Sequence, residues 1–251
     1  MSEKAIVMFF VALLIRCVFH WYFPDLANEH YEYKDGRSYV ELSKALTIEP
    51  VIKHGVNYNS WYLKCPAYVL FLKVIQRNIY VNIFVASIGV YLLCLMSLRA
   101  GVMFALYPPH IYYSVLFFKE SLLLTLIIFI LYVFRYRHWA WSFIWILIIM
   151  VPFQSVGILV DTAYVKVKYL QNFWNLWKPV FVVPSVHWIG WNYILAVPYS
   201  VLIILWIRRG KICSIQLAMF IVLSVVYTLV FGSSRYREPF MITLFLWTGN
   251  D

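Results

Sequence analysis

Long uncharged apolar runs, separated by short charged clusters, dominate this sequence. Because the runs approach the about 20 residues that a helix needs to cross a bilayer, they predict a polytopic transmembrane helical bundle. The runs are continuous and do not alternate apolar with polar residues, which favours helices over a β-barrel. The whole chain, 1–251, is therefore expected to form a single membrane domain. The predicted spans are residues 5–22, 78–98, 100–118, 121–134, 139–160, 189–207 and 212–231.

Two long connections, residues 24–77 and 161–187, interrupt the apolar pattern. Within the first connection, residues 38–46 place their apolar side chains on one helical face, which predicts a helix lying at the membrane interface. Residues 66–75 are a second apolar piece, too short to span. The tail, residues 238–251, is also too short to cross the bilayer and is expected to re-enter it or lie on it.

Two adjacent prolines, Pro108 and Pro109, interrupt the predicted span 100–118. Since proline lacks an N–H group and restricts the residue before it, the helix should end or kink near Tyr107. The next span, 121–134, covers only about 21 Å at the helical rise. Glu120, which opens this short span, should therefore lie below the lipid headgroups, where a carboxylate needs a cavity or a partner.

Composition and charge agree with this class of protein. The chain is 63% hydrophobic and 13% charged, and its mean hydropathy is +0.76, which excludes an ordinary soluble domain. The net charge is +10, but the basic residues gather at the ends of spans, so nucleic-acid binding is not expected. The clusters that the positive-inside rule places in the cytoplasm, together with the N-terminus, are Arg99, Arg135, Arg137, Arg208, Arg209 and Lys211.

This orientation sends both long connections, the turn 108–120 and the pair Arg235 and Arg237 to the non-cytoplasmic face. The first apolar run contains Arg16 and lacks a small-residue cleavage site, so it is read as a retained span. Within that span Arg16 should face a cavity or a partner, and the alternative is that it snorkels outward.

No nucleotide-binding or metal-binding motif is visible. The chain has no GxxxxGK[ST] phosphate loop, and His54 and His187 lack companion ligands at metal spacing. The carboxylates would tolerate a divalent cation, but no ligand cluster requires one. The cysteines suggest neither a disulfide framework nor a metal site, since Cys17, Cys94 and Cys213 lie in apolar runs and Cys65 stands alone.

The predicted outer face combines carboxylates with fixed cations. Asp35 and Glu120 are the acids, and an acid beside an apolar wall can act as a general base on a hydroxyl. Arg235 and Arg237 offer guanidinium forks that suit phosphate oxygens, although they could instead be interfacial anchors. This combination suits group transfer from a lipid phosphate.

Arg16 in the first span is followed in order by the segments Lys34–Ala45, Cys65–Tyr68, Tyr107–Ser121 and Ser234–Phe240. In sequence and in order they resemble the motifs of GT-C-type integral-membrane glycosyltransferases, which use polyprenyl-phosphate sugars. The resemblance implies that Asp35 is the catalytic base, that Glu120 is a second acid orienting a substrate, and that Arg235 and Arg237 contact the donor phosphate. It also implies substrate contacts for Arg16, Tyr39, Lys119 and Tyr236.

The resemblance further implies an inverting transfer to a hydroxyl of a glycan, a lipid or a protein, on the non-cytoplasmic face of a bacterial inner membrane. Two other functions stay open at this point. One is a non-catalytic membrane subunit or scaffold with a GT-C-like fold. The other is a transporter or polymerase of lipid-linked sugars. It would need an aqueous path, yet the only charges available to line one are Arg16 within the first predicted span and Glu120 at the start of the span 121–134.

Overall fold

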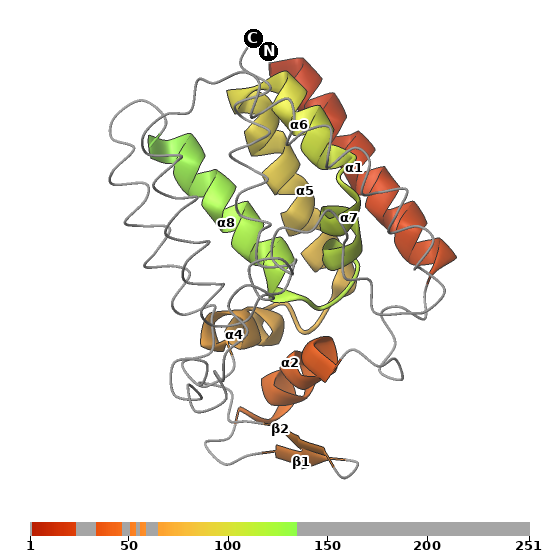
Figure 1. Cartoon of the computed structure of the whole chain (residues 1–251), viewed down its shortest axis with the longest axis vertical. Helices are drawn as coiled ribbons and strands as arrows, with labels where there is room; N and C mark the ends of the chain where they lie inside the picture. Colours follow the sequence, from red (N-terminus) through yellow and green to blue (C-terminus); the bar gives the residue numbers. More distant parts are fainter. Residues whose placement is uncertain (1, 24–33, 47–50, 54–55, 59–64, 135–251) are drawn as a thin grey trace, which may run out of the picture.

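The computed structural model describes residues 2–23, 34–46, 51–53, 56–58 and 65–134 (Figure 1). Several predicted features lie outside these residues. They are the spans 139–160, 189–207 and 212–231, the connection 161–187, the tail 238–251, and the side chains of Arg235, Tyr236 and Arg237.

The described part of the chain is a helical bundle with helices long enough to cross a membrane. Helix α1 (Ser2–Tyr22) covers the first predicted span and helix α5 (Ile79–Met96) the second. Both are apolar enough to cross, and a third crossing is formed if the bent pair α7 (Pro108–Ser114) and α8 (Lys119–Phe134) acts as one span. Helix α5 occupies the middle of the bundle, between α1 and α8 (Figure 1).

Helix α1 has two distinct faces. Its buried face carries Ala5, Ala12 and Arg16, all fully buried. Their spacing of seven and four residues places them on one side of the helix, where the two alanines allow close packing. The opposite face suits contact with lipid chains, because it exposes large apolar residues. These are Ile6, Val7, Phe10, Val11, Leu14 and Val18.

The chain reverses direction sharply after α5. Ser97 ends α5 and also caps α6 (Leu98–Ala105), where its hydroxyl oxygen accepts from the Ala100 N–H at 3.4 Å. Helix α6 then packs back against α5. A Cβ atom at Gly101 would collide with the Cys94 side chain and stand 2.8 Å from its Cα, so the close approach of these two helices requires glycine at this position.

The predicted span 100–118 is replaced by two short helices. Helix α6 ends at Ala105 and α7 begins at Pro108. The physical reason is the proline pair, which cannot continue α6 but suits the first turn of a new helix. A second break follows at residues 115–118, where α7 and α8 meet at 115°, and α8 begins at Lys119, two residues earlier than expected.

A buried amide from α5 stabilises the break between α7 and α8. Asn82, only 1% exposed, donates its side-chain N–H groups to the carbonyl oxygens of Ser114 at 2.8 Å and Leu116 at 3.2 Å. The Ser121 hydroxyl donates to the Asn82 side-chain oxygen at 3.4 Å. Carbonyls that a helix break leaves without intrahelical partners are thus satisfied inside the bundle.

Replacing Asn82 with leucine should lower the free energy of unfolding by about 1–3 kcal/mol, because two buried carbonyls lose their donor. Reversible unfolding in mixed micelles, followed by tryptophan fluorescence, measures this change. Asn78→Ser is the matched control, since Asn78 caps the exposed start of the same helix by accepting from the Tyr80 N–H, and serine caps equally well. Equal stability of the Asn82 variant and the control would contradict the role given to Asn82.

Three elements of the first long connection lie together beyond one end of the bundle (Figure 1). Helix α2 (Lys34–Ala45) corresponds to the predicted interfacial helix, and α4 (Pro66–Val74) corresponds to the second apolar piece. Strands β1 (Val51–Lys53) and β2 (Val56–Tyr58) form a short antiparallel hairpin, with Val51 opposite Tyr58. The sequence did not predict this hairpin, so the described ranges are helical apart from one small β element.

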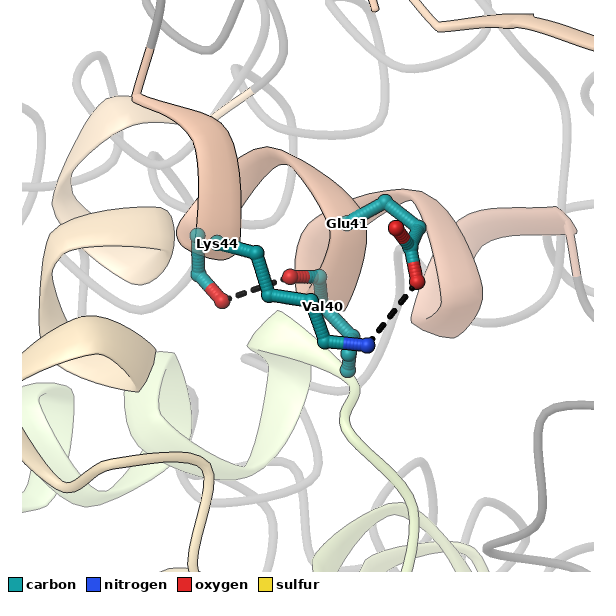
Figure 2. Close-up of polar contacts among 4 residues, drawn as sticks. Val40, Glu41 and Lys44 are labelled. Atoms are coloured by element: carbon teal, nitrogen blue, oxygen red, sulfur yellow. Dashed lines mark hydrogen bonds and ion pairs between the residues drawn. The ribbon is translucent and has the colours of Figure 1, made fainter. Parts of the chain in front are cut away.

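Helix α2 packs against α4. Its last turns are tied by local contacts: Lys44 lies 3.0 Å from the Glu41 carboxylate, and the Ser43 hydroxyl donates to the Val40 carbonyl at 2.7 Å (Figure 2). Tyr39 and Leu42 are buried on the face of α2 that enters the core. The amphipathic pattern read from the sequence therefore corresponds to burial against protein as well as to a position at the end of the bundle.

Candidate functional site

Residues from three separate segments meet at the end of the bundle where α2 and α4 lie. We call them the Glu120 cluster: Tyr39 of α2, Cys65 and Tyr68 at the start of α4, and Lys119 and Glu120 at the start of α8. All five side chains are buried, and both charged side chains are only 4% exposed. Glu120 therefore does not face bulk solvent, and the cluster includes three residues that the sequence had singled out, Tyr39, Lys119 and Glu120.

Ring and sulfur contacts join α2 to α4. The Tyr39 hydroxyl lies 3.7 Å from the Cys65 sulfur. The rings of Tyr39 and Tyr68 meet edge to face with their centroids 5.2 Å apart, an arrangement that aromatic pairs favour. Cys65 precedes Pro66 and has a positive φ of 150°, a strained backbone conformation for a residue with a side chain.

Electrostatic interactions join α4 to α8. Burial raises the pKa of the Cys65 thiol, while the neighbouring Lys119 ammonium and Tyr39 hydroxyl oppose the shift. Burial, with a further contribution from the Glu120 carboxylate, raises the pKa of the Tyr68 phenol well above its usual value. Both groups therefore stay protonated at neutral pH, and a nucleophilic thiolate at Cys65 is not favoured.

Tyr68 offers an unused hydrogen-bonding group. Its side chain is fully buried, and its hydroxyl has no hydrogen-bond partner among the residues that the structure describes. A buried hydroxyl without a partner is costly in free energy. Since the Glu120 carboxylate acts on the same phenol, the hydroxyl is available to a ligand that lies beside that carboxylate. The sequence did not single out Tyr68 by itself, and its place within the Cys65–Tyr68 segment was the only signal.

The backbone of Asp35 lies close to the same cluster. Asp35 is in the first turn of α2, one turn before Tyr39. The next residue, Gly36, lies against the turn that leads into α8, because a Cβ atom built on it would stand 3.6 Å from the Phe117 carbonyl oxygen. The start of α2 and the start of α8, far apart in sequence, are thus neighbours in space.

A second buried polar group lies between α1 and the turn region. Arg16 is fully buried, donates from Nη1 to the Ala12 carbonyl at 2.9 Å, and places Nη2 2.7 Å from Nδ1 of His110. The His110 ring stacks on Phe104, with centroids 4.0 Å apart. Arg16 thus faces a partner and does not snorkel outward. The sequence missed His110, although a buried arginine in a span calls for a polar partner and few polar side chains occur in the neighbouring apolar runs.

No group of three or more His, Cys, Asp or Glu side chains that could hold a metal ion occurs in the described ranges.

Within the residues that the structure describes, the fold and the buried polar groups define a class: a helical membrane protein in which two helices, or up to three, are long and apolar enough to cross a bilayer, and in which charged side chains are buried. The chain matches no family model, no curated protein and no solved structure.

Proposed function

We propose that this chain is a membrane glycosyltransferase that moves a sugar from a polyprenyl-phosphate donor to a hydroxyl acceptor. The observation that carries the proposal is the meeting of the first connection with the second turn: the start of α2, the start of α4 and the start of α8 converge around buried Glu120. These are three of the segments whose sequences resemble the GT-C-type enzymes. Their convergence is what a shared site for donor and acceptor needs.

Asp35 is the proposed base. It takes the proton of the acceptor hydroxyl while the hydroxyl oxygen attacks the anomeric carbon of the sugar from the side opposite the phosphate. The bond between that carbon and the phosphate oxygen breaks, and the lipid phosphate leaves with the electron pair. One displacement of this kind inverts the configuration at the anomeric carbon.

Glu120 and its neighbours orient the substrates in this proposal. A buried carboxylate accepts hydrogen bonds strongly, so Glu120 holds sugar or acceptor hydroxyls. The Tyr68 hydroxyl, which lacks a partner among the described residues, donates to the same substrate. Lys119, buried next to Glu120, supplies positive charge toward the leaving phosphate.

The remaining contacts to the donor are assigned to the C-terminal motif. In this proposal Arg235 and Arg237 bind the donor phosphate through their guanidinium forks, and Tyr236 is a further substrate contact. The positive-inside rule puts this motif and the first connection on the non-cytoplasmic face, which in this proposal is the outer face of a bacterial inner membrane. No step of the mechanism requires a divalent cation.

The proposed function is tested with purified protein in proteoliposomes that contain radiolabelled polyprenyl-phosphate sugars and membrane-extracted acceptors. We expect release of polyprenyl phosphate together with labelled product. Arg237→Ala should raise the KM for the donor about tenfold or more, since a charge-assisted contact to phosphate is lost. Arg99→Ala, which removes an exposed arginine at the start of α6, is the matched control.

Two results would contradict the proposed function: an unchanged KM for the donor in Arg237→Ala, or no turnover by the wild type with any of the polyprenyl-phosphate sugars tested. The alternative of a non-catalytic subunit predicts the second of these results.

A further inference from the structure

Arg16 is a buried cation in a helix long and apolar enough to cross a membrane, and no carboxylate neutralises it within the described part of the chain. Its two hydrogen bonds go to a backbone carbonyl and to an imidazole, neither of which carries negative charge. An enclosed charge without a counter-charge is strongly unfavourable. A negatively charged group beside Arg16 would remove this cost.

The contact between Arg16 and His110 determines which of their N–H groups remain able to donate to a ligand. A guanidinium has donors only, so Nδ1 of His110 must accept the hydrogen bond from Arg16. The imidazole is then neutral and carries its proton on Nε2. Its stacking on Phe104, with the ring planes 24° apart, holds the orientation of the imidazole. His110 thereby fixes the plane of the guanidinium.

The pair still has unused donors that point to an oxygen-rich ligand. The Arg16 Nε and the His110 Nε2 are buried without a hydrogen-bond partner in the ranges described. One turn further along α1, His20 is half-buried, and its Nδ1 is likewise unpaired there. Arg16 and His20, four residues apart, lie on the same side of α1. Polar nitrogens therefore extend from the end of α1 inward to the guanidinium.

We propose that Arg16 is the centre of an oxyanion-binding site that takes a phosphate group, and that His110 is its positioning residue. Phosphate fits because a guanidinium with free N–H groups binds two of its oxygens at once. The site is built by α1, α6 and α7 and is separate from the residues of the Glu120 cluster, which come from α2, α4 and α8. It does not depend on sugar transfer, so the two proposals can fail independently.

Binding to the purified protein in maltoside micelles tests this site with three probes: dodecyl phosphate, inorganic phosphate and, as a neutral control, dodecanol. Calorimetry should detect binding of dodecyl phosphate and no saturable binding of dodecanol. Arg16→Gln should weaken phosphate binding about tenfold or more, and Arg16→Lys, which keeps the charge without the fork, should fall between. Arg99→Gln, which removes an exposed arginine, should match the wild type.

Two variants of His110 separate positioning from packing. His110→Gln retains an acceptor for the guanidinium and should keep most of the affinity. His110→Phe retains the stacking on Phe104 but has no acceptor, and should lose affinity by several-fold. A purely structural role for His110 predicts the opposite order, because a phenyl ring packs better than an amide.

The source of the phosphate follows from the two phosphate probes. Dodecyl phosphate binding at least about tenfold tighter than inorganic phosphate indicates a lipid headgroup, and equal affinities indicate a soluble phosphate. The site is overturned if neither phosphate probe binds the wild type, or if Arg16→Gln and Arg16→Lys bind as the wild type does. If Arg16→Gln does not fold, Arg16→Lys and the two His110 variants decide. Retained phosphate binding without any sugar transfer would count against the proposed function alone.

Discussion

Replacing Asp35 with asparagine is expected to lower kcat for sugar transfer by about 10²–10⁴-fold, because asparagine has nearly the same shape and cannot accept the proton of the acceptor hydroxyl. The KM for the donor should change little, since the base acts on the acceptor. The proteoliposome assay with saturating donor measures this effect, and the melting temperature of the variant shows whether its fold is intact.

A matched control lies on the same helix. Glu41 is paired with Lys44 at 3.0 Å, two turns after the start of α2 (Figure 2). Glu41→Gln removes one carboxylate from α2 and should leave kcat within about twofold, although the loss of a partly buried ion pair lowers stability. Equal losses of kcat in Asp35→Asn and Glu41→Gln would mean that the charge of α2 matters but that Asp35 is not the base.

Glu120→Gln is the second substitution with a large expected effect. The Glu120 side chain is only 4% exposed, and its charge contributes to the raised pKa of the Tyr68 phenol. Glutamine at this position keeps the packing, but its neutral amide forms weaker hydrogen bonds to substrate hydroxyls. We expect kcat to fall about 10²-fold. The free energy of unfolding should change little, because the removal of one buried charge offsets the loss of the negative charge next to Lys119.

Steady-state kinetics together with unfolding in mixed micelles measure both quantities on one preparation. Glu3→Gln, at an exposed position in the first turn of α1, is the control for loss of a carboxylate. A Glu120→Gln variant with normal kcat would remove Glu120 from the site. If Glu120→Gln loses both activity and stability, the carboxylate of Glu120 stabilises the fold and does not bind substrate.

Local features of the fold follow from the sequence. Apolar length predicts α1 and α5, the amphipathic repeat predicts α2, and the proline pair at Pro108 predicts where one helix stops and the next begins. Each of these depends on neighbouring residues alone, through helix periodicity or through the missing N–H of proline. The boundaries agree to within a few residues for the same reason.

Features that depend on distant partners did not follow from the sequence. The 115° bend between α7 and α8 relies on Asn82, which lies more than thirty residues away and meets the bend only after α5 packs against it. The role of His110 likewise becomes visible only when the structure places it beside Arg16, 94 residues earlier in the sequence. Because a single polar residue in an apolar run has several equivalent places to point, its partner is decided by tertiary packing.

The sequence predicted only those features of the candidate site that depend on neighbouring residues. The low exposure of Glu120 follows from the short helix that it opens, whereas its approach to Tyr68 and Cys65 depends on how α4 docks. The roles assigned to Asp35, Arg235, Tyr236 and Arg237 are still predictions.

Cysteine cross-linking between positions 35 and 237 tests the central claim most directly, namely that the acid of the first connection and the arginines of the C-terminal motif line one substrate site, on opposite sides of the sugar that is transferred. Asp35→Cys and Arg237→Cys are combined in a chain without its native cysteines and treated in membranes with a short bifunctional methanethiosulfonate. We predict rapid cross-linking that polyprenyl phosphate slows, and none when Lys4→Cys, at the far end of α1, replaces Asp35→Cys. Cross-linking of position 237 to position 4 but not to position 35 would contradict the account.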